Sequence, residues 1–310
     1  VDRVYIRTSG DLKLENNSNF TITGGSYLFA GYGNNNTNGT LTISGGSYSV
    51  HSSFSVSSTA PDDTGSFVMT VFGGGDNATA RSFLGAHGNV TFNNGSRLTL
   101  GQGSHLLSTH GEIHFDQSAL LNIEDSLGQR DHVVRKDAII WVSNGFRAEN
   151  SANTVNFLDS EGLELRSAAG NIEWTGGVFK SKLRLDGVVA DNGSVTLRSV
   201  VSSEVLDGSI SITGGSIRAE GDPQEGSERF VTLIAEGQSG IDLQETYITA
   251  PSRVELTAGK DGQQYSINLS KTHIGAASGI DNGGSATQTD LLRLNGDAIL
   301  NNSSGGHGRE

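Results

Sequence analysis

Short phrases that join an apolar–polar–apolar run to a Gly-Gly turn recur along this 310-residue chain, and they restrict its fold more than any other feature. The clearest are Ile22-Thr-Gly-Gly-Ser26, Ile43-Ser-Gly-Gly-Ser47, Trp174-Thr-Gly-Gly-Val178 and Ile212-Thr-Gly-Gly-Ser216. Similar positions recur at nearly equal intervals, from Ile22 to Ile43 and from Gly88 to Gly111. Short strands that repeat with a period in the low twenties are typical of a β-solenoid.

Runs of three residues that read apolar, polar, apolar occur throughout the chain, whereas no stretch of a dozen residues has the apolar spacing of a helix. Examples are Leu12-Lys-Leu14, Ile113-His-Phe115, Val195-Thr-Leu197 and Val254-Glu-Leu256. Each run predicts a short strand with one buried face, and stacked coils would join these faces into one core. We therefore expect an all-β parallel solenoid over 1–310, a single segment of roughly 14 coils of 21–26 residues. A sandwich or barrel of antiparallel hairpins is the structural alternative.

The composition excludes several classes of protein. The chain has 43 Gly but only 3 Pro and no three-residue Gly period, which excludes collagen, and the Gly share indicates frequent corners. It contains no Cys, so disulfides and thiolate metal sites are excluded. A net charge of −13 without a basic stripe argues against nucleic acid as a partner. No run of about 18 apolar residues is present, so we expect a chain that does not span a membrane.

Five stretches interrupt the repeat and predict loops that protrude at corners, where binding residues collect: 57–65, 73–88, 126–137, 222–229 and 278–290. Such insertions are equally compatible with a passive role. Their charged residues are the first candidates for ligand binding, namely Asp62, Asp63, Arg130, His132, Arg135, Glu225, Glu228 and Arg229. The aromatic candidates for a glycan platform are Tyr32 and Trp141.

The residues that could carry catalysis or bind metal form no recognisable motif. The chain has no nucleophile elbow and no P-loop, and His105, His110 and His114 are explained by corners or by a solvated face. Carboxylates could pair across a groove as in polysaccharide-cleaving enzymes, with candidates Asp116, Glu124, Asp125, Glu161, Glu164 and Glu173. Because 34 acidic residues would form such pairs by chance, we expect solubility to be their role and predict no enzyme, no metal and no cofactor.

The acceptor motif Asn-x-Ser/Thr is abundant and clusters in the first third of the chain. It begins at Asn16, Asn19, Asn35, Asn38, Asn77, Asn89, Asn94, Asn192, Asn268, Asn301 and Asn302. These asparagines are possible N-glycosylation sites. Asn and Thr also gather at corners and on outward strand positions for structural reasons, so both explanations remain open.

Three longer phrases, 19–27, 88–96 and 208–216, together with the absent Cys and the many acceptor motifs, resemble the large exoproteins of bacterial two-partner secretion. The style is closest to filamentous haemagglutinin and the high-molecular-weight adhesins, and autotransporter passenger domains share it. The resemblance implies a right-handed parallel β-helix with sugars on Asn-x-Ser/Thr sites. It also implies export through an outer-membrane secretion partner, and location at the bacterial cell surface or in the medium.

The resemblance further implies a virulence-associated adhesin that binds a glycan or protein receptor of the host cell. The chain lacks a secretion-domain motif of the Asn-Pro-Asn type, so we expect an interior segment of a longer protein. Three functions remain open: an adhesin segment, a structural stalk without its own ligand, and a polysaccharide-degrading β-helix enzyme.

Overall fold

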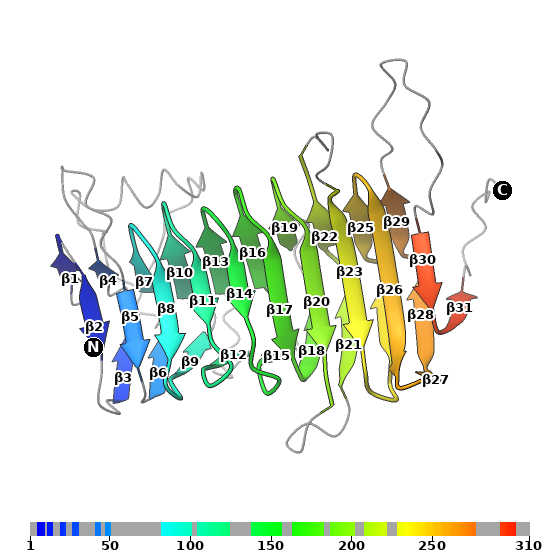
Figure 1. Ribbon diagram of the computed structural model, residues 1–310, viewed down its shortest axis with the longest axis horizontal. Coiled ribbons are helices and arrows are strands. Elements are labelled where there is room, and N and C mark those ends of the chain that lie inside the picture. The colour runs from blue at the N-terminus through cyan, green and yellow to red at the C-terminus, as the bar shows by residue number, and fades with distance from the viewer. Residues whose placement is uncertain are drawn as a thin grey trace, which may run out of the picture.

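The protein is composed of β-strands arranged in three long sheets (Figure 1). The computed structural model describes residues 5–9, 11–14, 19–22, 27–30, 41–44, 47–50, 82–100, 104–124, 138–156, 163–182, 187–201, 208–221, 228–276 and 292–301. Within these ranges no residue is helical. The expectation of an all-β chain is therefore confirmed for this part of the protein.

The strands of each sheet are given in the order in which they pair. Sheet 1 contains β1 (Tyr5–Thr8), β4 (Tyr27–Ala30), β7 (Ser82–Ala86), β10 (Ser104–Ser108), β13 (Ala138–Val142), β16 (Leu163–Ser167), β19 (Val188–Ala190), β22 (Ser216–Ala219), β25 (Tyr247–Ala250) and β29 (His273–Ala276). Sheet 2 contains β2 (Leu12–Leu14), β5 (Leu41–Ser44), β8 (Val90–Asn93), β11 (Ile113–Phe115), β14 (Phe146–Ala148), β17 (Ile172–Gly176), β20 (Val195–Ser199), β23 (Phe230–Ala235), β26 (Arg253–Lys260) and β27 (Gln263–Gln264). Its last strand, β30 (Leu292–Asn295), pairs with β26 rather than with β27. Sheet 3 contains β3 (Asn19–Ile22), β6 (Ser47–Val50), β9 (Arg97–Leu100), β12 (Leu120–Glu124), β15 (Thr154–Asn156), β18 (Val178–Lys182), β21 (Ser209–Thr213), β24 (Ile241–Gln244), β28 (Ser266–Ser270) and β31 (Asp297–Asn301).

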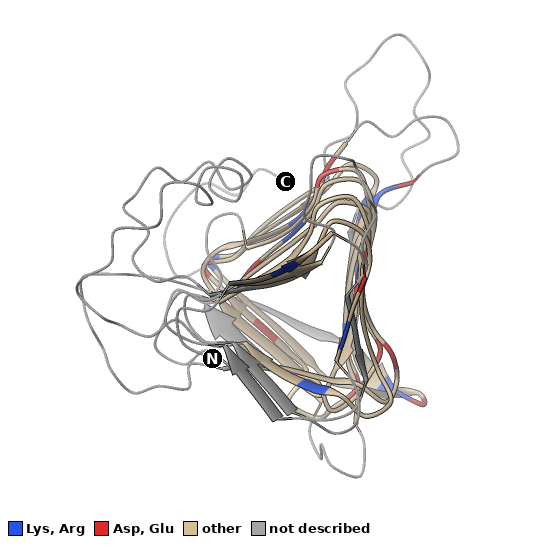
Figure 2. Cartoon of the chain, turned by 90° about the vertical axis from the view of Figure 1, so that its left-hand side faces the viewer, with Lys and Arg blue, Asp and Glu red and all other residues tan. Residues whose placement is uncertain are grey.

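The described chain visits sheets 1, 2 and 3 in turn, and each strand pairs in parallel with the corresponding strand of the next turn. Seen end-on, the three sheets enclose a triangular interior (Figure 2). The described strands contain one antiparallel pairing, a short hairpin between the end of β26 and β27. This arrangement is compatible with a β-solenoid and differs from the hairpins of a sandwich.

The predicted period in the low twenties is found between several registered partners. Val90 pairs with Ile113, and Val231 pairs with Val254, so each pair repeats at the interval that the sequence indicates. The prediction that Ile22 and Ile43 occupy the same position in successive turns is wrong. Ile22 lies in sheet 3 and pairs with Val50, whereas Ile43 lies in sheet 2. The Gly-Gly phrase follows strands of both sheets because its turn chemistry suits either corner.

The turns of the chain also vary in length more than the sequence predicts. Tyr5 and Tyr27 are registered partners one short turn apart, but the next registered partner of Tyr27 is Phe83, much further along the chain. Sheets 1 and 3 each hold ten described strands, and sheet 2 holds eleven including the short hairpin strand β27.

One predicted insertion, 73–88, is wrong in its second half. Residues Ser82–Ala86 form strand β7 of sheet 1, and the side chains of Leu84 and Ala86 are buried. The run was missed because Gly85 occupies its outward position, where an apolar–polar alternation would show a polar residue. Three further insertions, 57–65, 126–137 and 278–290, lie outside the described residues, as do residues 222–227 of the fourth.

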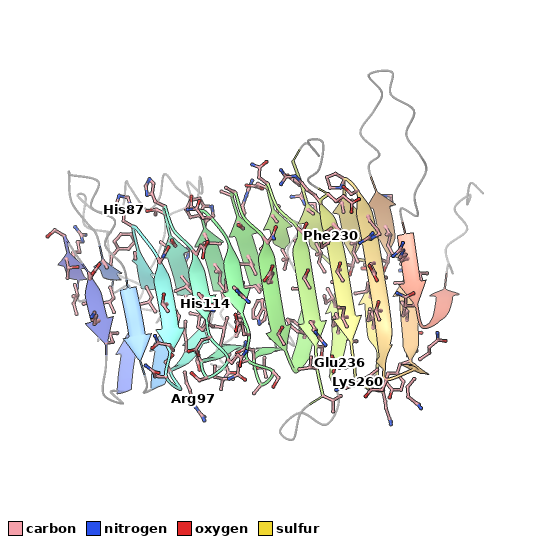
Figure 3. All side chains as sticks on the ribbon, viewed as in Figure 1. His87, Arg97, His114, Phe230, Glu236 and Lys260 are labelled. Atoms are coloured by element: carbon pink, nitrogen blue, oxygen red, sulfur yellow. The ribbon has the colours of Figure 1, made fainter. Side chains whose placement is uncertain are left out.

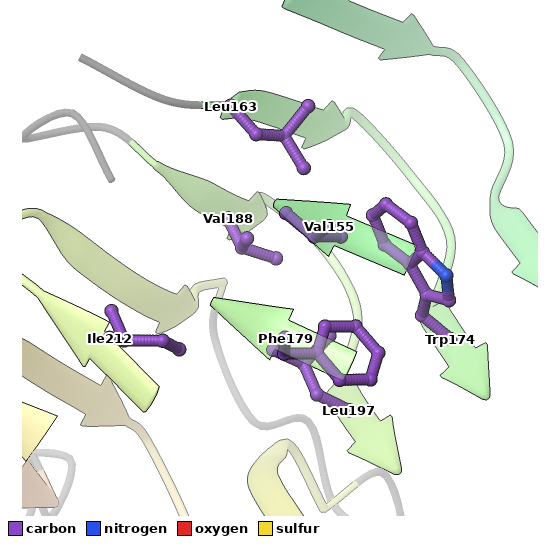
Figure 4. A pocket seen from close by; sticks show the side chains of 7 residues that line it. All are labelled: Val155, Leu163, Trp174, Phe179, Val188, Leu197 and Ile212. Atoms are coloured by element: carbon purple, nitrogen blue, oxygen red, sulfur yellow. The ribbon is translucent and has the colours of Figure 1, made fainter. Parts of the chain in front are cut away.

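Inward-facing side chains form one continuous apolar core along the interior. Phe92 and Phe115 stack with ring centroids 4.1 Å apart, and Trp174 contacts Phe146 at 5.2 Å and Phe179 at 5.6 Å. Beside Trp174 the core leaves a void of about 10 Å³ whose lining is apolar (Figure 4). Its apolar lining offers a water molecule no hydrogen-bond partner.

Asn153 is a buried polar residue that joins three successive turns. Its Oδ1 accepts a hydrogen bond from the backbone N–H of Leu121 at 2.7 Å, and its Nδ2 donates to the carbonyl of Thr175 at 3.1 Å. Leu121 belongs to β12 and Thr175 to β17, so a single amide side chain satisfies backbone groups on both neighbours. Buried backbone groups need such partners because water cannot reach them.

The described residues contain no helix that is long and apolar enough to cross a membrane.

Candidate functional site

The outer face of sheet 2 carries a cluster of alternating charges near its middle (Figure 3). Arg147 lies between two carboxylates, with its Nε 2.7 Å from Glu149 Oε1 and 3.7 Å from Glu173 Oε2. His114, which is registered with Arg147 on the adjacent strand, contacts Glu149 at 3.3 Å. The guanidinium of Arg147 thus lies within ion-pair distance of both carboxylates.

A second cluster lies at the edge of sheet 2 where its strands end, with Glu236 directly after β23 (Figure 3). Its buried carboxylate accepts hydrogen bonds from Arg198 at 2.6 Å and from Lys260 at 2.9 Å. Burial alone would raise the pKa of Glu236, but the hydrogen bonds and charges of Arg198 and Lys260 outweigh it and hold that pKa below its usual value. This ion triad connects the ends of the neighbouring strands β20, β23 and β26, which is a structural role.

Other carboxylates are paired in the same way. Cationic partners lie within 3.1 Å in the pairs Arg166–Asp191, Arg218–Glu220 and Lys271–Glu245. The described acidic candidates for catalysis are not brought together. Glu173 lies outward on sheet 2 and Glu164 is registered with Ile139 on sheet 1, while Asp116 accepts hydrogen bonds from the backbone N–H groups of Ser118 and Ala119. The side chain of Glu124, and residues Asp125 and Glu161, are outside the described part.

The three histidines that lie close in sequence are separate in space. His105 is buried in β10 of sheet 1, His114 lies on sheet 2, and His110 lies at the corner between them. His110 instead meets His87, with their Nδ1 atoms 3.1 Å apart. One period of the repeat separates these two residues, so that period is the sequence signal that could have identified the pair. Burial, and in smaller part the charge of His110, lower the pKa of His87.

The predicted ligand-binding residues are only partly described by the structure. Glu228 is exposed, whereas Arg229 is partly buried; its backbone N–H donates to Ser252 Oγ, and its carbonyl accepts from the N–H of Ser252. Trp141 faces outward on sheet 1 between Leu107 and Arg166 but is itself partly buried. The others lie outside the described residues: Asp62, Asp63, Arg130, His132, Arg135, Glu225 and Tyr32.

Tyr247 is an exposed aromatic residue that the sequence analysis overlooked. It lies on the outer face of sheet 1 with half of its surface exposed, and its ring centroid is 5.7 Å from that of His273 on the next strand. The alternation in Tyr247-Ile-Thr-Ala250 could have indicated it, because Ile248 faces inward and so places Tyr247 outward. An exposed ring beside polar groups is the kind of platform on which sugars stack.

Four of the possible glycosylation sites have described side chains. Asn89, Asn94 and Asn192 are exposed and lie at corners, and Asn268 is partly buried on sheet 3. Two of them support neighbouring turns: Asn89 Oδ1 accepts from the N–H of Glu112 at 3.0 Å, and Asn192 Nδ2 donates to the carbonyl of Ala168 at 3.3 Å. The structural explanation of these asparagines therefore has direct support, and glycosylation stays a prediction.

The remaining acceptor motifs carry no such information. Asn19 and Asn301 lie in β3 and β31, where only the backbone is described, and five begin outside the described residues: Asn16, Asn35, Asn38, Asn77 and Asn302.

Comparisons with known proteins give no family assignment: no family model matches the chain, and no curated protein or solved structure is significantly similar to it.

Proposed function

We propose that this chain is a non-enzymatic adhesin segment of a bacterial protein exported by two-partner secretion, with a host-cell glycan or protein receptor as its partner. In this proposal it is a right-handed parallel β-helix, released from or held at the cell surface by way of an outer-membrane secretion partner.

The observation that carries the proposal is the repeated passage of the chain through three parallel sheets, which gives the described part of the molecule long, regular outer faces. The insertions that the sequence predicts would add binding loops to this scaffold. Tyr247 adds an exposed aromatic side chain to the outer face of sheet 1. A long surface that carries several loops and an exposed aromatic side chain suits adhesion to a large partner.

The charge arrangement favours adhesion over polysaccharide cleavage. A glycosidase needs one carboxylate that is poised as an acid and a second across the scissile bond. Among the described carboxylates, Glu149, Glu173 and Glu236 are held by cationic partners instead. A stalk without a ligand is the second candidate, supported by the same regular sheets.

A cell-binding assay with the intact 310-residue chain tests the proposal and separates it from both alternatives. We expect saturable binding that falls at least tenfold in Tyr247→Ala, in the triple variant Arg130→Ala/His132→Ala/Arg135→Ala, or in both. Thr232→Ala is the matched control, because Thr232 is an outward residue within strand β23 of sheet 2, and it should bind as the unsubstituted chain does.

The outcomes differ between the three functions. Absence of binding by the intact, folded chain would contradict the adhesin and leave the stalk. Release of reducing ends from a panel of acidic polysaccharides would instead support an enzyme. Circular dichroism of each variant establishes that a loss of binding is not a loss of fold.

A further inference from the structure

We propose that His87 and His110 form a binding site for a divalent transition-metal ion with tetragonal geometry, Cu²⁺ or Ni²⁺, at the corner between sheets 1 and 2. His87, labelled in Figure 3, follows β7, and His110 follows β10; these two strands are adjacent and parallel (Figure 1). The backbone N–H of His110 donates to the carbonyl of His87 at 2.8 Å, so the corner itself holds the two residues side by side. The site is thus built by the stacking of turns.

The distance between the two imidazoles matches a chelating pair. The Nδ1 atoms are 3.1 Å apart, and the ring centroids are 4.4 Å apart with the rings nearly perpendicular. Two nitrogens at this separation, each about 2.1 Å from a shared ion, subtend an angle of about 95° at that ion. That angle is close to the right angle between neighbouring ligands of a tetragonal ion and smaller than the tetrahedral angle that Zn²⁺ prefers.

Thr109 supplies a third polar atom to the same point. Its Oγ1 contacts His87 Nδ1 and lies 3.1 Å from His110 Nδ1. A neutral imidazole nitrogen either donates or accepts, so the two nitrogens and one hydroxyl cannot form three full hydrogen bonds with one another. If all three contacts are hydrogen bonds, one imidazole N–H is shared between two acceptors. A metal ion would satisfy both nitrogen lone pairs at once.

The corner is accessible to an ion from solvent. His110 is exposed and His87 is partly exposed. Within the described residues, no group of three or more His, Cys, Asp or Glu side chains is placed to hold a metal, so the site offers two nitrogens and a hydroxyl, and water would complete the shell. The net charge of −13 attracts divalent cations to the molecule as a whole. An open, two-histidine site predicts exchangeable rather than structural binding.

Copper titration of the full chain with CuCl₂, followed by electron paramagnetic resonance, tests the site. We expect a tight class of Cu²⁺ with superhyperfine coupling to two nitrogens. Each of His87→Ala and His110→Ala should weaken it at least tenfold, because either change removes one arm of the chelate. His114→Ala and His273→Ala are matched controls, since these histidines lie on outer sheet faces away from the corner, and they should leave this class unchanged.

Two results would overturn the proposal. One is a spectrum and affinity that persist in His87→Ala and His110→Ala, and the other is an equal loss in His114→Ala. Circular dichroism without copper shows whether a variant still folds. If either alanine variant unfolds, His110→Phe serves in its place, because it keeps a ring at the corner while removing the ligand atom.

Discussion

Replacement of Trp174 by alanine should lower the free energy of unfolding by about 3–5 kcal/mol. The Trp174 ring is buried in the core between Phe146 and Phe179, and its removal would enlarge a void that the core already contains. The neighbouring strands are parallel and hydrogen-bonded on both sides, so they cannot close around the missing ring. Urea denaturation followed by far-ultraviolet circular dichroism measures the change.

Trp174→Phe is the informative control for this prediction. The indole Nε1 of Trp174 is buried and has no hydrogen-bond partner in the described part of the chain. Phenylalanine removes that unsatisfied group while retaining most of the ring, so its cost should be well below that of alanine. An alanine variant within about 1 kcal/mol of the unsubstituted chain would contradict a packed core at this position.

Asn153→Ala should be the second most damaging change, with a cost of about 2–5 kcal/mol, because one buried and one partly buried backbone group lose their partner. These groups are the N–H of Leu121 and the carbonyl of Thr175, and each such loss costs about 1–3 kcal/mol. Because the two groups lie on the turns before and after Asn153, the loss weakens the contact between turns. The same denaturation experiment measures it.

Asn150→Ala is the matched control for Asn153. Asn150 Oδ1 accepts one hydrogen bond from the nearby N–H of Ala152 at 2.9 Å, so it supports a local turn only. Its loss should cost no more than about 1 kcal/mol. Equal costs at the two positions would show that Asn153 does not join turns as described.

Local patterns in the sequence predict the strands well, because a strand with one buried face needs only an alternation of apolar and polar residues. Ile113-His-Phe115 and Val254-Glu-Leu256 lie in β11 and β26, and their apolar residues are buried. Trp174 likewise packs inward. These features depend on neighbouring residues alone, which is why the sequence reveals them.

Features that depend on the register between turns were not predictable. Ile22 and Ile43 share a phrase but lie in different sheets, since the same Gly-Gly turn suits two corners. The sequence separation of registered partners is far larger for Tyr27 and Phe83 than for Tyr5 and Tyr27, so no fixed period identifies them.

The two side-chain clusters differ in this respect. The ion triad of Glu236, Arg198 and Lys260 arises only when turns of different length are aligned, whereas His87 and His110 lie one period apart, so the period could have indicated that pair. Alignment of turns is a property of the whole coil, and a local pattern does not contain it.

Disulfide trapping tests the stacking of turns most directly, and the proposed adhesin and the histidine site both rest on that stacking. Thr196 and Thr232 are registered partners on the outer face of sheet 2, although a whole turn of the chain separates them in sequence. The chain contains no Cys, so a double variant introduces the only two thiols. Neighbouring parallel strands are about 4.8 Å apart, within the range that a disulfide spans.

Under mild oxidation, Thr196→Cys/Thr232→Cys should form an intramolecular disulfide, detected by loss of free thiols and faster migration on a non-reducing gel. Thr196→Cys/Thr249→Cys is the control, because Thr249 lies outward on sheet 1. The account predicts a bond in the first variant and free thiols in the second. Free thiols in the first variant, or a bond in the second, would contradict it.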